Sequence, residues 1–463
     1  MAAVLASFIA ESPLTGFGAG GYMLIHSPDR GEAVLLDFFV EVPGRGGTER
    51  SAELVPVPVY FTEEQPQVFH IGAASCGVPG TAAGLKRALV RYGSMPLGSL
   101  IEPAVNAARD GLPITPRQAF FMKILAPILT HTEEGRAIYA PGGRILGEGE
   151  TLRWPDLALA LERYAAEGSA PFCSGPIAAE IAAWVLERGG TLTQADLAAY
   201  EPIDRAPVRA SFRGRDVLTN PPPSSGGILI ALSLELLDRI EEIGTDELVD
   251  SMIAAQEARG EEFLAGLYQE GFAERFLTDR LGSTTHITAV DGEGRCAAVT
   301  CSNGTGSGLI VPGTGVHVNN MLGEEDLNPL GFHRHETGRR MPSMMAPTVI
   351  LRDGELQAGL GSGGSNRIRS AILQAAVGMV DRSMQVQEAV DAPRVHFEAG
   401  AVHAEPGVDA AALERLQRRG LEVVRWPDRN VFFGGVHAVG RDPDSGELAG
   451  GGDPRRGGAV ALV

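Results

Sequence analysis

The spacing of apolar residues predicts two kinds of element along this chain. Between residues 81 and 200, apolar side chains recur at intervals of three and four residues, which is typical of amphipathic helices. Elsewhere, short apolar runs are separated by turn residues, which is the pattern of strand hairpins. Tyr22–His26 and Ala33–Phe38 form one such pair, and Thr348–Leu351 and Glu355–Gly359 form another.

The order of these elements predicts the fold class. A stiff loop, Pro221–Gly227, leads into an apolar helix at Ile228–Leu237, and strands follow at His286–Val290 and Cys296–Cys301. The glycine-rich run 361–365 then opens a further helix. Helices and strands in separate blocks predict a layered α+β fold with stacked sheets.

Composition indicates a globular protein with an excess of acidic groups. Of the 463 residues, 44% are hydrophobic and 21% are charged, and the net charge is −19. This charge disfavours nucleic acid and anionic membranes as partners. No window holds the roughly 18 apolar residues that a membrane helix needs. The apolar N-terminus lacks the basic flank of a signal peptide, so the sequence as written predicts a soluble cytoplasmic protein.

Neither the cysteines nor the histidines form a recognisable metal site. The four cysteines include no CxxC pair, and Cys296 and Cys301 are five residues apart on one expected strand, so they point to opposite faces. His333 and His335, with Glu336 beside them, lack an HExxH spacing and a further ligand, so solvated loop side chains are expected there. The sequence therefore predicts no metal and no cofactor.

Thr284 is a candidate nucleophile at the first position of an expected buried strand, in the run Thr-Thr-His-Ile-Thr-Ala-Val-Asp. If the bond between Ser283 and Thr284 were cut, Thr284 would carry both a hydroxyl and a free α-amine. The amine can take the proton while the hydroxyl attacks an acyl carbon. The alternative is a threonine without a chemical role, because threonine is common in strands.

Two glycine-rich loops are candidates for ligand binding. Gly16, Gly18 and Gly21 satisfy a GxGxxG pattern, but Tyr22–His26 continues as a strand where a dinucleotide site needs a helix, so a tight turn is favoured. The run 361–365 does precede a helix, and its amides could bind an anion or an oxyanion. No lysine follows it, so it is not a phosphate-binding P-loop.

Motifs spread over the whole chain form a recognisable set. They are Gly16–Gly21, Asp37-Phe38, Gly77–Gly84, Pro221–Gly227, Thr284-Thr285-His286, Asn319-Asn320, Pro347-Thr348, Gly361–Ile368, Ala392-Pro393-Arg394 and Asp453-Pro454-Arg455. The set resembles the γ-glutamyltransferase (glutathione hydrolase) family of N-terminal-nucleophile hydrolases, from about residue 1 to the C-terminus. The proline-serine-glycine run together with the later Thr-Thr-His is its most specific part.

The resemblance implies a four-layer αββα sandwich that is made as a proenzyme and cuts itself before the nucleophile. Here the cut would follow Ser283. It would leave a large fragment, 1–283, and a small fragment, 284–463, which remain together as a heterodimer forming one interleaved domain.

The resemblance also implies the chemistry of individual residues. Thr284 would attack the γ-carbonyl of a glutamyl amide, with its own α-amine as general base, and the acyl group would pass to water or to an amino acid or peptide. The backbone amides of Gly364 and Ser365 would bind the oxyanion. Ser302 falls where the family places a hydroxyl close to the nucleophile.

Substrate-binding positions are implied in the same way, with notable departures. Asn303, Glu324 and Ser343 fall where the family contacts the α-amino and α-carboxylate groups of the substrate. Phe39 stands where the glutathione-handling branch has an arginine that pairs with the α-carboxylate.

Two further departures also replace polar residues. Met321 stands where a glutamine is usual, and Met344 replaces the second of two serines, so the acyl pocket is expected to be less polar. Arg45, or an arginine elsewhere, could supply the missing cation.

Three functions remain open at this point. The first is a γ-glutamyl hydrolase or transferase, and the second is an acylase of the same fold that takes glutaryl or other acyl groups. The third is a relative that binds ligands without processing or catalysis, which the start of the chain inside a usually internal helix of the family suggests. A missing beginning would also allow a periplasmic or secreted protein.

Overall fold

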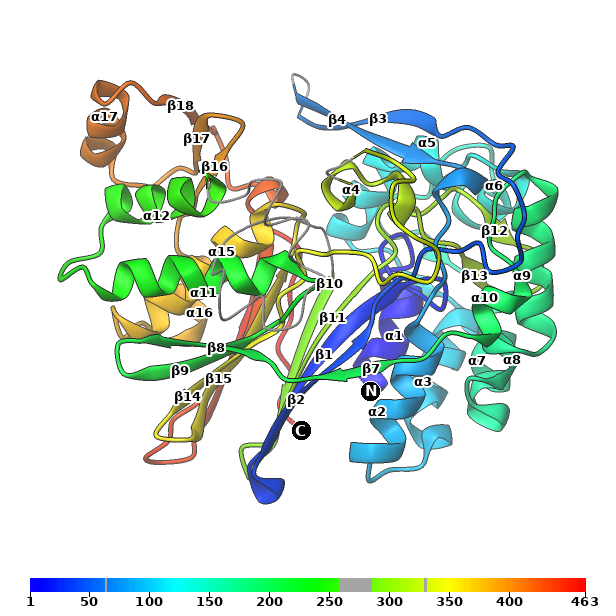
Figure 1. Ribbon diagram of the computed structural model, residues 1–463, viewed down its shortest axis with the longest axis horizontal. Coiled ribbons are helices and arrows are strands. Elements are labelled where there is room, and N and C mark those ends of the chain that lie inside the picture. The colour runs from blue at the N-terminus through cyan, green and yellow to red at the C-terminus, as the bar shows by residue number, and fades with distance from the viewer. Residues whose placement is uncertain (63–64, 258–284, 329–330) are drawn as a thin grey trace. The chain divides into compact units, whose positions relative to one another are not determined.

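The computed structural model describes residues 1–62, 65–257, 285–328 and 331–463 (Figure 1). The chain forms two compact units, each assembled from three stretches of sequence. Unit 1 consists of Met1–Gly21, Leu36–Ile203 and Cys301–Met341, and unit 2 consists of Tyr22–Leu35, Asp204–Thr300 and Pro342–Val463. Each unit therefore draws on chain from both sides of the predicted cleavage point.

Unit 1 is rich in helices, as the periodicity of residues 81–200 predicts. Helix α3 (Leu97–Asp110) packs against α1 (Ala2–Ala10) and α7 (Pro155–Glu167), and the predicted apolar face of α7 is buried. The other helices of this unit are α2 (Thr81–Tyr92), α4 (Pro116–Ile124), α5 (Ala126–Leu129), α6 (Glu133–Tyr139), α8 (Ala170–Cys173), α9 (Pro176–Glu187) and α10 (Gln194–Ala198).

Short strand pairs complete unit 1. The hairpin of β3 (Val55–Thr62) and β4 (Gln65–Ile71) is antiparallel. The smaller pairs are β5 (Leu112–Pro113) with β6 (Thr151–Leu152), and β12 (Ile310–Val311) with β13 (Val316–His317). Thr193 begins α10 with a reciprocal capping box, in which the Asp196 carboxylate accepts from the Thr193 amide at 2.9 Å.

One sheet has five strands in the order β10-β11-β1-β2-β7. It contains the predicted hairpin Tyr22–His26 with Ala33–Phe38 and the two predicted strands His286–Val290 and Cys296–Cys301. Its strands are β10 (Thr285–Val290), β11 (Cys296–Ser302), β1 (Gly20–Ser27), β2 (Glu32–Phe38) and β7 (Ile203–Arg205).

A second sheet, in unit 2, has six strands in the order β20-β19-β15-β14-β9-β8. Its strands are β20 (Leu448–Gly452), β19 (Gly435–Arg441), β15 (Glu355–Gly363), β14 (Thr348–Arg352), β9 (Arg215–Thr219) and β8 (Val208–Phe212). Helices α11 (Ser225–Asp238), α15 (Arg367–Val380) and α16 (Val386–Asp391) cover one face of it (Figure 1). Their apolar side chains and those of the sheet form one hydrophobic core.

The other face of the six-stranded sheet meets β10, which packs on β15 and β19. Unit 2 thus contains a helical layer followed by two stacked sheets. In unit 1, α2 packs on Phe38 at the end of β2, because Gly84 brings the helix backbone against the phenyl ring. These are the layers that the α+β prediction requires.

A smaller module of unit 2 carries three strands in the order β16-β17-β18. They are β16 (Val395–Glu398), β17 (Ala401–Ala404) and β18 (Glu422–Arg425), and helices α12 (Thr245–Glu257) and α17 (Ala410–Arg418) pack beside them. Trp426 stacks on Phe432 at 4.6 Å between ring centroids and anchors this module locally.

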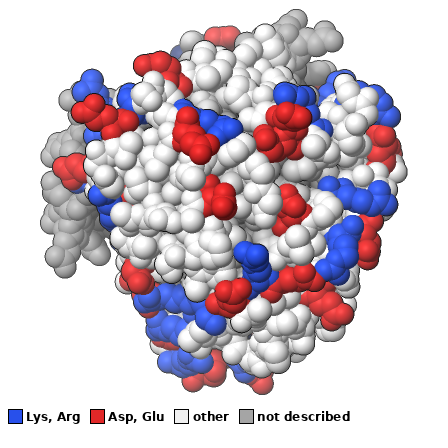
Figure 2. All heavy atoms as spheres, turned by 90° about the vertical axis from the view of Figure 1, so that its right-hand side faces the viewer, with Lys and Arg blue, Asp and Glu red and all other residues white. Residues whose placement is uncertain are grey.

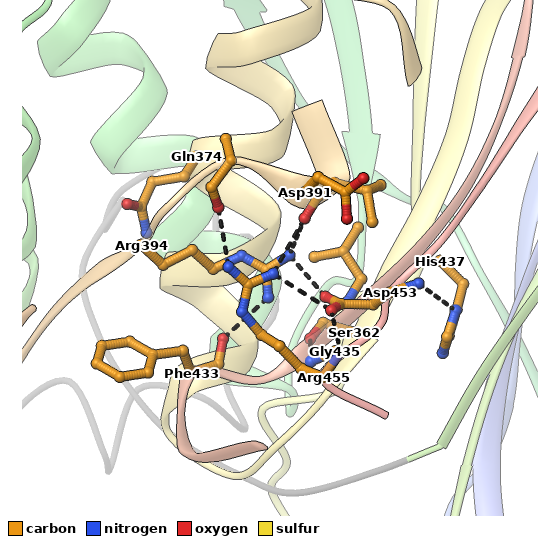
Figure 3. A network of polar contacts seen from close by, with 12 residues as sticks. Ser362, Gln374, Asp391, Arg394, Phe433, Gly435, His437, Asp453 and Arg455 are labelled. Atoms are coloured by element: carbon orange, nitrogen blue, oxygen red, sulfur yellow. Dashed lines mark hydrogen bonds and ion pairs between the residues drawn. The ribbon is translucent and has the colours of Figure 1, made fainter. Parts of the chain in front are cut away.

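A network of buried charges holds the C-terminal segment of unit 2 (Figure 3). Asp453 accepts from Arg394 Nη2 at 2.7 Å and from the Val436 amide at 2.8 Å, and Arg455 pairs with both Asp453 and Glu405. Burial raises the pKa of Asp453, but the two arginines outweigh it and keep the pKa below its usual range. Loss of either partner would leave an unpaired buried charge, so this network fixes the start of β19.

The distribution of surface charge and the length of the apolar helices both agree with the composition. On the face shown in Figure 2, acidic and basic side chains are interspersed among uncharged ones. Among the helices in the described part of the chain, none is by itself long and apolar enough to cross a membrane; only the bent pair Pro155–Glu167 and Ala170–Glu187 reaches that length together.

Two helix glycines provide a test of the packing between α2 and β2. A Cβ at Gly84 would lie 2.2 Å from Cγ of Phe38, whereas a Cβ at Gly98 in α3 would meet nothing within 4 Å. We expect Gly84→Ala to lower the free energy of unfolding by about 1–3 kcal/mol, because the helix must move away from the ring. Gly98→Ala, the control, should raise it by up to about 1 kcal/mol. Urea denaturation measures both, and equal effects would contradict this packing.

Candidate active site

The proposed nucleophile Thr284 and its neighbour Ser283 lie outside the described residues. The description resumes at Thr285, the first residue of β10, so the strand predicted to follow the nucleophile is confirmed. Its second residue, His286, is buried. The described strand therefore begins at the residue that directly follows Thr284 in the sequence.

His286 is held from three sides within unit 2. Its Nδ1 lies 2.8 Å from the Thr300 hydroxyl and its Nε2 lies 2.8 Å from the Thr288 hydroxyl. A Cβ on Gly361 of β15 would lie 2.3 Å from the imidazole, so only glycine allows the two sheets to approach here. Burial, together with the neighbouring His437, lowers the pKa of His286 well below its ordinary value. His286 is therefore a neutral anchor for the strand.

Unit 1 brings three of the predicted residues into one cluster. Ser302 Oγ accepts a hydrogen bond from the Gly304 amide at 2.9 Å. Asn303 donates through Nδ2 to the carbonyl of His317 at 3.1 Å, and its Oδ1 has no hydrogen-bond partner among the described residues. Glu324 Oε1 accepts from the Thr305 amide at 3.2 Å. Ser302, Asn303 and Glu324 thus surround a single turn of chain.

Gly304 and Thr305 are parts of this cluster that the sequence did not single out. Gly304 has φ +64°, and a Cβ there would lie 2.7 Å from Glu324 Oε1 and 2.1 Å from Asn320 Oδ1. The Thr305 amide also donates to Asn320 at 2.9 Å. The glycine is needed because the turn passes directly over these two side chains. The repeated glycines of residues 304–308 were the available signal.

Phe39 is fully buried in unit 1, and its backbone is held on both sides. Its amide donates to Asp37 at 2.9 Å, and its carbonyl accepts from Tyr200 and from Arg340, each at 2.6 Å. The residue that replaces the family's arginine is therefore fixed in place. Arg340, which supports it, was not among the residues predicted from sequence.

Two arginines of unit 1, Arg45 and Arg340, already have acidic partners. Arg45 lies 3.0 Å from Glu41 and 3.9 Å from Asp196. Arg340 lies 3.4 Å from Glu41 and 3.5 Å from Asp37. The charge of Arg45, which the sequence suggested as a replacement cation, is thus committed to ion pairs within unit 1.

Gly364 and Ser365 stand in unit 2 between β15 and α15. Both have positive φ, +128° for Gly364 and +55° for Ser365. The loop is shorter than predicted, because Gly361–Gly363 continue β15 and pair with β19 as far as Gly435. A Cβ on Gly364 would lie 2.7 Å from Cα of Gly434, so the two loops touch through backbone alone.

Ser343 lies where the loop Pro221–Gly227 meets the chain before β14. Its carbonyl accepts from the Ser225 amide at 2.7 Å and from the Ser224 hydroxyl at 2.9 Å, and its own hydroxyl accepts from the Met345 amide at 3.0 Å. Met344 is fully buried in the core of unit 2. The serine-glycine motif therefore positions the segment that carries Ser343.

The fold defines a class of protein. The structure matches the crystal structure of cephalosporin acylase from Bacillus halodurans with a TM-score of 0.83, covering 99% of this chain and 90% of that one at 24% identity. This likeness is one of fold. It confirms the predicted four-layer αββα sandwich.

The family follows from the sequence comparisons. The family model described as Gamma-glutamyltranspeptidase matches residues 1–266 and 254–463. Glutathione hydrolase proenzyme of Escherichia coli (strain K12) is 29% identical over 490 residues, 95% of this chain and 82% of the relative. Acylase ACY 1 proenzyme of Pseudomonas sp. (strain SE83) is 30% identical over 485 residues, 97% of this chain and 86% of the relative. The chain belongs to the gamma-glutamyltranspeptidase family, and the resemblance seen in its motifs is confirmed.

The buried His317 beneath Asn303 gives a pH-dependent test of this cluster. Its Nε2 accepts from the Gly308 amide at 3.2 Å, and burial lowers the pKa of His317 to about 4. Unfolded His317 gains a proton near pH 6.5, so the contribution of His317 to the free energy of unfolding should fall as pH drops from about 6.5 towards 4, by up to about 1.4 kcal/mol per pH unit. Urea denaturation across this range measures the slope.

The matched variants separate His317 from other titrating groups. His317→Gln keeps an acceptor for the Gly308 amide but removes the titration, so its stability should depend less on pH. His131→Gln, at an exposed position, should change the slope less. An identical slope for the wild type and His317→Gln would contradict a buried neutral imidazole.

Proposed function

We propose that this chain is a γ-glutamyl hydrolase or transferase that works through Thr284. Membership of the gamma-glutamyltranspeptidase family and the likeness to glutathione hydrolase proenzymes support this. The observation that carries the proposal is the anchoring of β10 from Thr285 onward by His286 and Gly361. The strand that begins one residue after Thr284 is therefore held rigidly, which suits a strand that follows a nucleophile.

The chain is proposed to be a proenzyme that is cut between Ser283 and Thr284 into fragments 1–283 and 284–463. The cut frees the α-amine of Thr284, which takes the proton of the hydroxyl as the oxygen attacks the γ-carbonyl carbon. The same amine then gives the proton to the departing amine, leaving an ester between the glutamyl group and Thr284. Water or the amine of an amino acid or peptide attacks this ester and restores the threonine.

The amides of Gly364 and Ser365 are the proposed donors to the oxyanion of the tetrahedral intermediates. Their positive φ values and their place before α15 support this, because amides at a helix start favour negative charge. The Ser302 hydroxyl is proposed to assist near the nucleophile. Donors of this kind are fixed before the reaction and stabilise charge as it develops.

The substrate head group is proposed to bind Asn303, Glu324 and Ser343. Asn303 Oδ1 is a buried acceptor, and Glu324 is a buried carboxylate whose Oε1 accepts from the Thr305 amide. Acceptors of this kind suit the ammonium of an α-amino acid. Ser343 offers a hydroxyl that suits the carboxylate.

An acylase of the same fold is the second candidate, and one observation favours it. Phe39 is buried where a cation is expected, and both Arg45 and Arg340 are paired with carboxylates. Met321 and Met344 are also buried apolar side chains. An acyl group without an α-amino acid head, such as glutaryl, would need no cation there. The likeness to Acylase ACY 1 proenzyme agrees with this candidate. The third candidate is a relative that binds ligands but neither cuts itself nor catalyses a reaction.

Replacing Thr284 tests the nucleophile. Thr284→Ala should remain a single chain and lose at least about a thousandfold in kcat, because neither the cut nor the acyl-enzyme can form without the hydroxyl. Thr284→Ser, which keeps a hydroxyl, should still split into two fragments. A denaturing gel and an anilide hydrolysis assay measure these outcomes. Splitting of Thr284→Ala after residue 283 would refute the assignment.

Replacing Phe39 separates the two substrate classes. Phe39→Arg should raise kcat/KM for a γ-glutamyl anilide relative to a glutaryl anilide by about ten- to a hundredfold, since a charge-assisted contact with the α-carboxylate is worth about 1.5–3 kcal/mol. Phe39→Leu, the control for lost packing, should leave the ratio unchanged. A strong wild-type preference for the glutaryl anilide would support the acylase, and no change with Phe39→Arg would mean that the carboxylate binds elsewhere.

A further inference from the structure

One face of α15 is tied by side chains to strand β16. Gln374 forms two hydrogen bonds with the backbone of Val395, of 3.0 and 2.9 Å. One turn nearer the start of the helix, Ser370 Oγ lies 2.6 Å from Nδ1 of His396. A spacing of four residues keeps both contacts on one helix face. One further turn towards the N-terminus, this face reaches Asn366.

Glu398, the last residue of β16, provides the third tie. Its carboxylate accepts a hydrogen bond from Nδ2 of Asn366 and lies 3.7 Å from Nη1 of Arg367 and 3.5 Å from Nε2 of His396. The helix is therefore held at three successive turns. The tie at Glu398 is the one nearest to the loop that precedes the helix.

The charges of this cluster follow from burial and geometry. Burial raises the pKa of Glu398, but the bond with His396 and the charge of Arg367 outweigh it and hold the pKa below its usual range. Burial also lowers the pKa of His396 to about 4, so the imidazole is neutral. A carboxylate can only accept, so a proton on Nε2, 3.5 Å from Glu398, suits this arrangement and leaves Nδ1 as an acceptor for the Ser370 hydroxyl. Glu398 is thus an ionised acceptor at the start of α15.

The loop before α15 needs such support. Ser365 has φ +55°, a conformation that a residue with a Cβ adopts only when its surroundings impose it. Asn366 stands at the N-cap position, yet its side chain makes no capping bond to the helix amides, and its Nδ2 donates to Glu398. The side chain that would usually fasten the helix to itself is instead fastened to β16.

We propose that Glu398 is a positioning residue for the backbone amides of Gly364 and Ser365, acting through Asn366. By holding Asn366, it fixes the residue that follows the strained Ser365 and so sets where these two amides point. The inference rests on the proposed function, in which these amides bind the oxyanion. A displacement of about 1 Å at such a site can cost on the order of a hundredfold in rate.

Three variants test this on the processed enzyme, with whichever anilide, γ-glutamyl or glutaryl, the wild type hydrolyses faster. Glu398→Ala removes the acceptor, Glu398→Gln keeps an oxygen for Asn366, and Gln374→Ala cuts the tie two turns further along the same face. Thermal melting is measured alongside kcat and KM. Should Glu398→Ala fail to fold, Asn366→Ala breaks the same bond from the helix side and takes its place.

We expect Glu398→Ala to lower kcat about ten- to a hundredfold with KM within about threefold. Displaced amide donors stabilise the oxyanion less, and they act mainly in the transition state. Glu398→Gln should keep kcat within about threefold of the wild type. Gln374→Ala should lower the melting temperature and leave kcat unchanged. Unchanged kcat in folded Glu398→Ala, or an equal loss in Gln374→Ala, would overturn the inference. A wild type inactive on both anilides would overturn the proposed function as well.

Discussion

The packing of His286 against Gly361 sets how closely the two sheets of unit 2 approach at the start of β10. Any side chain at position 361 would collide with the imidazole, and the imidazole is itself fixed by hydroxyls on both ring nitrogens. Because cores are close-packed, this contact leaves the strand little freedom. The residue that precedes the strand is Thr284, so the rest of the proposed chemistry depends on this contact.

A glycine also allows close packing at three other positions in the proposed functional loops. Gly364 touches Gly434 through backbone alone, Gly226 lies against the carbonyl of Met344, and Gly304 passes over Glu324. At each of these glycines, the absence of a side chain lets the loop backbone lie directly against its neighbour. Charged side chains then hold these loops: the buried Asp453 with its arginines at the start of β19, and the partly buried Glu398 at the start of α15. Glycines therefore allow the loops to pack closely, and ion pairs hold the loops in place.

Local signals in the sequence were sufficient for much of the fold. The hairpin on either side of Asp29 and the buried apolar face of α7 follow from short-range patterns, and the structure confirms them. The end of β15 was predicted wrongly: a run of glycines reads as a loop, but pairing with β19 extends the strand to Gly363. Tertiary pairing overrides local preference there.

Partners that lie far apart in the chain could not be predicted. Phe39 was recognised as a departure by its position in a motif, but Arg340, which binds its carbonyl, is 301 residues away. Asn366 and Glu398 are separated by helices α15 and α16 and most of strand β16, and neither belongs to a pattern with a known spacing. Such contacts arise from packing in three dimensions and leave no periodic signal in the sequence.

Intact-mass spectrometry of the purified wild-type protein tests the central claim most directly. The account predicts two fragments, of which the smaller comprises residues 284–463 and begins with Thr284. A single intact chain after prolonged incubation, or a break at any other bond, would contradict it.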